Sequence, residues 1–132
     1  MQIFFSYDAS DKEFAKILGD QLSKRGLSPW IVDAELMPGD NWAIAIGEAL
    51  KRSRAMVVLL SPDSVKSEYL KREVEFALGD SKFEGRIFPV VVRPTKDVPW
   101  ILRTLRVLDA KQGPNRVAAS IADALKMVAS PN

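Results

Sequence analysis

The chain has 132 residues and no cysteine or histidine, and its 19 Lys and Arg against 17 Asp and Glu leave a formal net charge of +2. This length predicts one domain with a sizeable core, and the balanced charge argues against an electrostatic grip on nucleic acid or a membrane surface. The missing residue types exclude thiol nucleophiles, disulfides, histidine proton shuttles, Ser-His-Asp triads and the usual zinc sites, so any chemistry must use carboxylates, hydroxyls, Lys or Arg.

Five short β-type runs alternate with helical patterns along the chain. We expect strands over residues 2–6, 29–32, 55–60, 87–92 and 105–108. Runs as apolar as AMVVLL and IFPVVV are typical of strands buried on both faces, which requires a parallel sheet covered by helices on both sides. The alternation therefore predicts an α/β fold, a flavodoxin-like three-layer sandwich whose five-stranded parallel sheet has the order 2-1-3-4-5.

The helical patterns have recognisable starts and ends. The first begins with a capping box at residues 10–13 (SDKE) and ends at Gly26, the third is capped by Ser67, and the last opens near residues 114–115. The residues expected to face the core are Phe14, Ile17, Leu18 and Leu22, then Trp42, Ile46, Ala49 and Leu50, then Leu70, Val74, Ala77 and Leu78, and finally Val117, Ile121, Leu125 and Val128.

Glu73 is an acid placed against the apolar side of its helix. At about 100° per residue, Glu68 and Glu75 fall on the solvent side, whereas Glu73 lies at the edge of the apolar stripe between Tyr69 and Phe76. No basic residue stands three or four positions from Glu73, so its charge has no local partner. The plainer alternative is a boundary glutamate that is solvated or paired with a lysine from elsewhere in the fold.

The expected sheet order also predicts where a ligand would bind. In such sheets ligands lie beyond the carboxyl ends of the strands, near the switch point between the first and third strands. The segments expected there are residues 6–10, residues 33–41 and residues 61–62, the last leading toward Glu73. Glu73 reaches this crevice only if residues 63–66 form a turn and the helix starts near Ser67.

Four segments together resemble the sequence boxes of a TIR (Toll/interleukin-1 receptor) domain. They are residues 4–7 (FFSY), residues 36–42 (LMPGDNW), residues 57–62 (VVLLSP) and the pattern Ser67-x-Tyr69-x-x-x-Glu73-x-x-x-Ala77. The resemblance covers nearly the whole chain in the right order and spacing. We therefore expect a single TIR domain over residues 1–132, either complete or excised from a longer protein. Its PG-x-x-W form is more similar to bacterial members than to animal receptor adaptors.

The TIR resemblance implies a family divided between enzymes that consume NAD⁺ and non-enzymatic interaction modules. In the enzymatic members a glutamate four residues after an aromatic on the third helix is catalytic, and that position is Glu73 after Tyr69. We therefore expect an NAD⁺ glycohydrolase or cyclase that cleaves the nicotinamide–ribose bond, with NAD⁺ as substrate and neither cofactor nor metal. Attack by water gives ADP-ribose, whereas attack by a group of the same molecule gives a cyclic isomer, and the sequence does not choose between them.

Eight further residues are expected to bind the substrate. Tyr7 and Trp42 are candidate stacking surfaces for the nicotinamide or adenine ring, although Trp42 also fits ordinary core packing on its helix. Pro38 and Gly39 either shape a mobile loop over the site or form a plain turn. The expected set is Ser6, Tyr7, Asp33, Pro38, Gly39, Trp42, Ser67 and Tyr69.

Partners and location follow from the same resemblance. TIR enzymes are switched on by self-assembly, in which a loop of a neighbouring molecule completes the site. We therefore expect NAD⁺, other TIR domains and a fused or associated sensor domain as partners, in immune or anti-phage signalling. The longest apolar run is too short to span a bilayer and no signal peptide precedes the first strand, which predicts a cytoplasmic domain without membrane or direct nucleic-acid contacts.

Other functional classes are disfavoured. A phospho-receiver shares this fold but needs an aspartate at the end of the third strand, where this chain has Leu60 and Ser61. The sequence contains neither GxGxxG nor GxxxxGK[ST], the motifs of dinucleotide and P-loop phosphate binding. The main alternative to an enzyme is therefore a TIR module that binds other TIR surfaces and in which Glu73 is an ordinary helix residue.

Overall fold

The computed structural model describes residues 1–129, with side chains through Met127. The five strands are β1 (Gln2–Ser6), β2 (Ser28–Trp30), β3 (Ala55–Leu60), β4 (Ile87–Val91) and β5 (Leu108–Asp109). All strand pairs are parallel, and their order is β2-β1-β3-β4-β5. The predicted flavodoxin-like sheet is confirmed.

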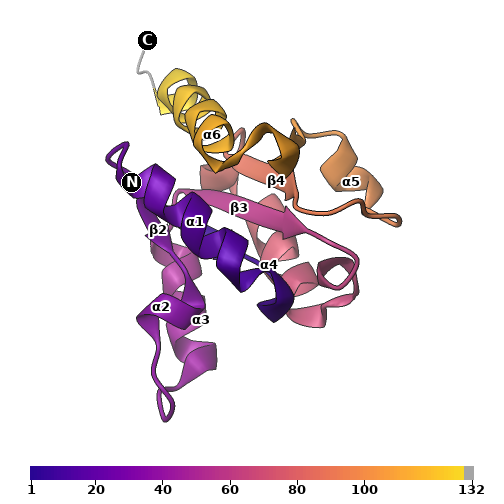
Figure 1. The fold of residues 1–132 in the computed structure, drawn as a ribbon. Coiled ribbons are helices and arrows are strands. Elements are labelled where there is room, and N and C mark those ends of the chain that lie inside the picture. Colours follow the sequence, from indigo (N-terminus) through magenta and orange to yellow (C-terminus); the bar gives the residue numbers. More distant parts are fainter. Residues whose placement is uncertain (130–132) are drawn as a thin grey trace.

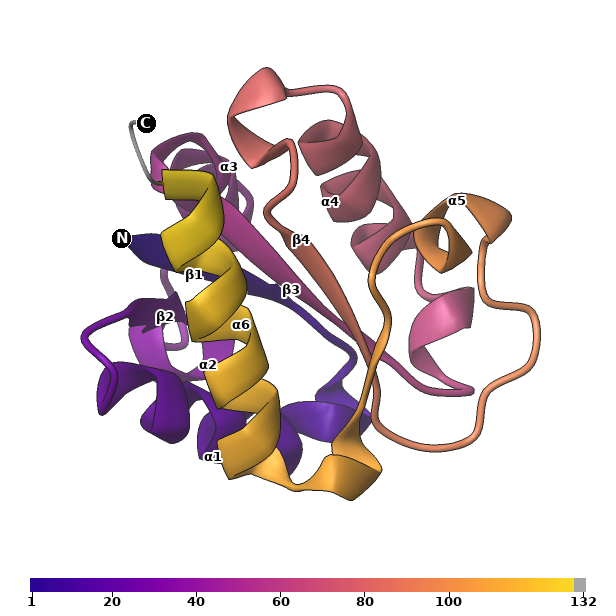
Figure 2. The ribbon, with the colours of Figure 1, turned by 90° about the horizontal axis from the view of Figure 1, so that it is seen from above.

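Helices cover both faces of this sheet. They are α1 (Lys12–Ser23), α2 (Val32–Glu35), α3 (Trp42–Arg52), α4 (Glu68–Leu78), α5 (Trp100–Arg103) and α6 (Pro114–Ala129). Helices α1 and α6 lie on one face, and α3 and α4 lie on the other (Figures 1 and 2). None of the described helices combines the length and the hydropathy that a bilayer span requires.

The two faces explain why the central strands are apolar throughout. Successive strand residues point to opposite sides. In β3, Val57 and Leu59 belong to the core under α1 and α6, whereas Met56 and Val58 belong to the core under α3 and α4. All six residues of β3 are buried, so neither side of the strand can be polar.

Four of the expected elements have other bounds than predicted. The second strand ends at Trp30, and residues 32–35 form the short helix α2 instead of continuing it. The fourth strand ends one residue early, at Val91. The fifth strand lies at Leu108–Asp109, and residues 100–103 form the unpredicted helix α5. The capping box at residues 10–13 is also absent, since a 3₁₀ turn at Ala9–Asp11 precedes α1.

Several expected core residues are exposed. Ile17 is 46% exposed, Trp42 and Leu78 are each 39% exposed, and the side chain of Val128 lies outside the described residues. Helix α1 turns Gly19 rather than Ile17 toward the sheet. A Cβ atom at Gly19 would lie 2.8 Å from Cδ1 of Ile31, so a larger residue here would require the Ile31 side chain to shift.

Candidate active site

A cavity of about 430 Å³ opens at the carboxyl end of β1, between that strand and helices α2, α3 and α4. It lies at the predicted switch point of the sheet. The lining residues are Tyr7, Asp8, Ala9, Val32, Asp33, Trp42, Ala43, Ile46, Ser67, Tyr69 and Glu73. Six of the nine residues expected at the site therefore line one cavity, and a seventh, Ser6, contacts it through a hydrogen bond to Glu73.

Glu73 reaches the cavity because the chain turns between β3 and α4. Residues 64–66 form a 3₁₀ turn, and α4 then starts at Glu68 with Ser67 as its N-cap, whose Oγ accepts a hydrogen bond from the Leu70 N–H at 3.2 Å. The buried Ser6 at the end of β1 donates its Oγ–H to Oε1 of Glu73 at 2.7 Å. This short turn and the N-cap confirm the local geometry predicted from the sequence.

The electrostatics of Glu73 differ from those of a surface glutamate. Burial raises the pKa of its carboxyl group to about 7, and the hydrogen bond from Ser6 opposes part of that rise. Among the ion pairs of the described residues, none involves Glu73. A carboxylate in a poorly solvated cavity without a compensating cation is suited to stabilising a positive charge on a bound molecule.

Tyr7 and Asp33 are tied to each other at the edge of the cavity. The Tyr7 hydroxyl donates to Oδ2 of Asp33 and accepts a hydrogen bond from the Asp33 N–H at 3.3 Å. Burial, and then the hydrogen bond to Asp33, raise the pKa of the Tyr7 phenol far above its ordinary value, so this side chain is neutral. The pair fastens α2 to the end of β1.

The aromatic surroundings are only partly as predicted. Tyr69 and Trp42 both line the cavity, with 76% and 39% of their side chains exposed, so the prediction that Trp42 packs in the core is wrong. Phe76 does not line the cavity. It packs edge-on against Phe83 with ring centroids 6.3 Å apart and faces the Lys82 ammonium, so the expected flank of Glu73 by Phe76 is wrong.

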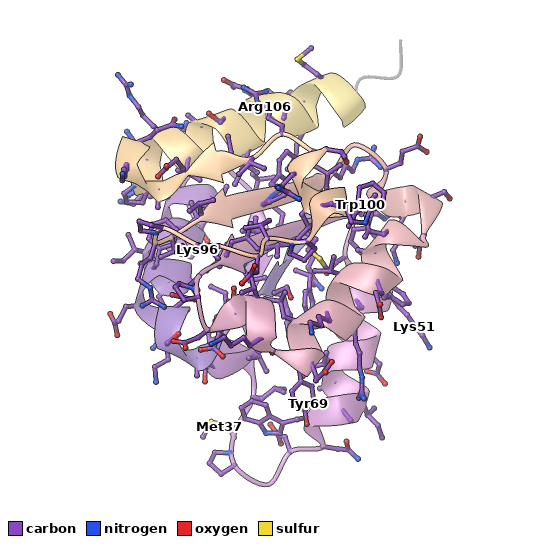
Figure 3. The ribbon with its side chains drawn as sticks, turned by 90° about the vertical axis from the view of Figure 1, so that its right-hand side faces the viewer. Met37, Lys51, Tyr69, Lys96, Trp100 and Arg106 are labelled. Atoms are coloured by element: carbon purple, nitrogen blue, oxygen red, sulfur yellow. The ribbon has the colours of Figure 1, made fainter. Side chains whose placement is uncertain are left out.

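The structure does not bring Pro38 and Gly39 to the cavity lining. They form the turn of the exposed loop between α2 and α3, where Gly39 has a φ of 99° that favours glycine. Asp40 closes this turn, because its Oδ2 accepts from the Met37 N–H at 2.8 Å. Figure 3 shows Met37 and Tyr69 at the same end of the molecule, with Arg106 at the opposite end.

Two features near this cavity are missing from the predicted site residues, although the segment 6–10 that contains Asp8 was expected near it. Asp8 lines it, and its Oδ2 accepts hydrogen bonds from the N–H and hydroxyl of Ser10. The signal was its position directly after Tyr7 at the end of the strand. The second feature is the buried Asp11, which accepts from the Ser61 hydroxyl and lies 3.3 Å from Nη2 of Arg93. These contacts tie the ends of β1, β3 and β4 together, and sequence spacing gave no sign of them.

A second, slightly larger cavity of about 500 Å³ lies at the amino end of β4, beside the end of α4. Phe83, Ile87, Leu105 and Arg106 are among its lining residues. None of the residues expected at the site lines it, so the smaller cavity around Glu73 is the candidate active site.

A flavodoxin-like sheet with a partly buried glutamate at its switch point defines a class of α/β domain, and comparison with known proteins gives its family. The model of the TIR domain family matches residues 3–125. The chain belongs to the TIR domain family. It is 28% identical, over 111 residues, to the stimulator of interferon genes protein of Magallana gigas. That match covers 80% of this chain but 27% of the relative, so the chain spans about a quarter of the relative's length.

Solved TIR structures share the fold. The TIR domain of the Toll-related receptor TRR-2 from Hydra magnipapillata matches with a TM-score of 0.74 and 22% identity, over 92% of this chain and 97% of that one. The metazoan TIR-STING receptor from C. gigas in complex with 2′,3′-cGAMP matches with a TM-score of 0.70 and 23% identity, over 88% of this chain and 38% of that one. The TIR domains of the activated Roq1 resistosome, which directly recognizes the pathogen effector XopQ, match with a TM-score of 0.58 and 25% identity. The match covers 96% of this chain and 72% of that one.

Proposed function

We propose that this TIR domain is an NAD⁺ nucleosidase that cleaves the nicotinamide–ribose bond, with Glu73 as the catalytic residue. The observation that carries the proposal is the environment of Glu73. Its carboxyl group faces a cavity, accepts a hydrogen bond from Ser6 at 2.7 Å and has a pKa raised to about 7 by burial. Carboxyl groups with a perturbed pKa in a cleft cluster at functional sites.

The proposed reaction needs a carboxylate to stabilise positive charge, and it does not need an acid to protonate the leaving group. When the bond between the ring nitrogen and C1′ breaks, its electron pair neutralises the pyridinium ring, so nicotinamide leaves without protonation. Positive charge then grows on the ribose, and an ionised Glu73 stabilises it, as the carboxylates of glycosidases do. The low dielectric of the cavity strengthens this interaction. Attack by water gives ADP-ribose, and attack by a group of the same molecule gives a cyclic isomer.

The other lining residues have supporting roles in this proposal. Trp42 and Tyr69 offer exposed aromatic faces on which the nicotinamide ring can stack. Ser6 orients the Glu73 carboxylate, and the Tyr7–Asp33 pair holds α2 at the edge of the cavity. The Ser67 hydroxyl caps α4, so its first role is to position the helix that carries Glu73.

We further propose that the domain works by self-assembly, in the cytoplasm, in immune or anti-phage signalling. Large apolar side chains are exposed on α3 and in the loop before it, with Met37 at 69% and Ile44 at 59%. Such side chains favour burial against another protein surface. The same observation supports the second candidate function, a TIR–TIR interaction module in which Glu73 has no catalytic role.

Clustering the protein on beads and measuring nicotinamide release from NAD⁺ separates the two candidates. We expect release by the clustered wild type and a loss of at least about a hundredfold in the Glu73→Gln variant, the size of effect seen when one transition-state-stabilising group is removed. Glu75→Gln is the matched control, because Glu75 is an exposed carboxylate on the same helix. No release from the clustered wild type, or undiminished release from Glu73→Gln, leaves the interaction module as the function.

A further inference from the structure

The charged groups that line the candidate active site all have the same sign. Asp8, Asp33 and Glu73 face the cavity, and its lining contains no Lys or Arg. The hydrogen-bond donors to these carboxylates, among the residues that the structure describes, include the uncharged side chains of Ser10, Tyr7 and Ser6. None of the three acids takes part in an ion pair within that part of the chain.

The nearby Arg93 forms ion pairs with acids outside the cavity. The Arg93 guanidinium reaches the Ser10 hydroxyl at 3.4 Å, but it lies 3.3 Å from Asp11 and 3.7 Å from Asp63 and does not line the cavity. The whole chain carries a formal charge of +2, so the acidity of this cavity is local. The three acids also form no group suited to a metal ion within the described residues.

The negative charge of this cavity attracts one half of NAD⁺ and repels the other. The nicotinamide riboside half carries a positive pyridinium ring, which the carboxylates attract and the faces of Trp42 and Tyr69 can stack upon. The diphosphate carries negative charge, which the same carboxylates repel. The cavity volume of about 430 Å³ is also in the lower part of the range for small-molecule sites, which suits a nucleoside better than a dinucleotide.

We propose that the cavity of each domain binds cationic N-ribosyl pyridinium nucleosides, represented by nicotinamide riboside, in preference to their phosphorylated forms, and that the assembled domain hydrolyses them with the same preference. This inference rests on the proposed catalytic role of Glu73 and names the part of the substrate that the cavity selects. The N1–C1′ bond breaks, its electrons return to the ring, and neutral nicotinamide leaves. The oxygen of a water molecule then bonds to C1′ and releases its proton to solvent, which gives ribose.

The loss of affinity caused by a phosphate on the ligand can be estimated from Coulomb's law. At an effective dielectric constant of about 20, adding one negative charge to the ligand within about 6 Å of these carboxylates corresponds to at least about a tenfold loss of affinity. We therefore expect kcat/KM for nicotinamide riboside to exceed that for nicotinamide mononucleotide at least about tenfold in the clustered domain. Nicotinamide release is measured at pH 8 by chromatography for both compounds and for NAD⁺.

Binding can be measured independently of turnover. A pyridinium ring stacked near Trp42 should quench its fluorescence, and a Trp100→Phe background removes the exposed tryptophan outside the cavity. We expect saturable quenching by nicotinamide riboside, weaker binding of its phosphorylated form and of the neutral dihydro form, and loss of the signal in Trp42→Phe. Equal binding of the charged, neutral and phosphorylated compounds overturns the inference.

A pair of charge variants tests whether the cavity is the cause. Asp8→Asn removes one lining carboxylate and should lower the ratio of nucleoside to nucleotide kcat/KM about tenfold. Asp20→Asn makes the same charge change on the exposed side of α1 and should leave the ratio unchanged. A ratio that does not respond to Asp8→Asn overturns the inference.

The outcomes for the two proposals are distinguishable. Glu73-dependent release from NAD⁺ by clustered protein, without a preference for the nucleoside over its phosphorylated form, overturns this inference and leaves the proposed function standing. Release from none of the three compounds, clustered or dilute, overturns both proposals.

Discussion

Replacement of Glu73 by glutamine should stabilise the fold at alkaline pH even though it removes the proposed catalytic group. Glutamine has nearly the same shape and keeps an oxygen that can accept the hydrogen bond from Ser6. The change removes only the ability to ionise. It therefore isolates the free energy that the fold loses by holding a carboxylate in a poorly solvated cavity.

The size and sign of this effect follow from the pKa. Burial raises the pKa of Glu73 from an ordinary 4.5 to about 7. Between these values the folded protein holds a proton that the unfolded chain has released, so the free energy of unfolding falls as the pH rises toward 7 and above. The gap of about 2.5 between the two pKa values corresponds to about 3 kcal/mol at about 1.36 kcal/mol per unit. About 2 kcal/mol of this is lost between pH 5.5 and 8.5.

Urea denaturation of wild type and Glu73→Gln at several pH values measures this difference. The free energy of unfolding of the variant should exceed that of wild type by an amount that grows by about 2 kcal/mol from pH 5.5 to 8.5. Glu75→Gln, on the exposed side of the same helix, should show no such growth. A difference that is independent of pH, or that favours wild type at pH 8.5, would refute the conclusion that Glu73 is poorly solvated.

Three further predictions concern the same site. Nicotinamide release should rise with pH and level off above an apparent pKa of about 7, because only the ionised form of Glu73 stabilises a cationic ribose, and a flat profile from pH 5.5 to 8.5 would contradict this. Ser6→Ala removes the hydrogen bond that lowers the pKa of Glu73, so the midpoint of that profile should move to higher pH, and an unchanged or lower midpoint would argue against the contact. Tyr7→Phe removes the donor to Asp33 and should lower the free energy of unfolding by about 1 kcal/mol in urea, with faster amide exchange at Ala34 in α2, whereas unchanged exchange would show that the pair does not hold the helix.

The parts of the molecule that sequence reasoning predicted depend on local patterns. The continuous apolar run of residues 55–60 indicated a strand buried on both faces, and β3 is buried at every position. The serine at position 67 indicated a helix start, and its hydroxyl does cap α4. Both signals arise within a few residues of chain, where the rise of a strand or the turn of a helix relates spacing directly to geometry.

Short or edge elements were predicted less well. Helices α2 and α5 have four residues each, too few for a helical period to show in the sequence. The strand β5 pairs with β4 through only two residue positions, Val90 with Leu108 and Val91 with Asp109. Where an element is this short, its ends depend on the neighbours against which it packs and not on its own composition.

The sequence by itself determined the family, the order of the sheet and the position of Glu73 on an amphipathic helix, because each of these follows from residue types and their local spacing. Only the tertiary structure decided the environment of that acid. Ser6 and Glu73 are 67 residues apart, and Tyr7 and Asp33 are 26 apart, yet each pair shares a hydrogen bond. Helix periodicity also placed Phe76 beside Glu73, whereas packing against Phe83 turned it away. Solvation and partners are set by what distant segments bring to a site, and no local pattern contains that information.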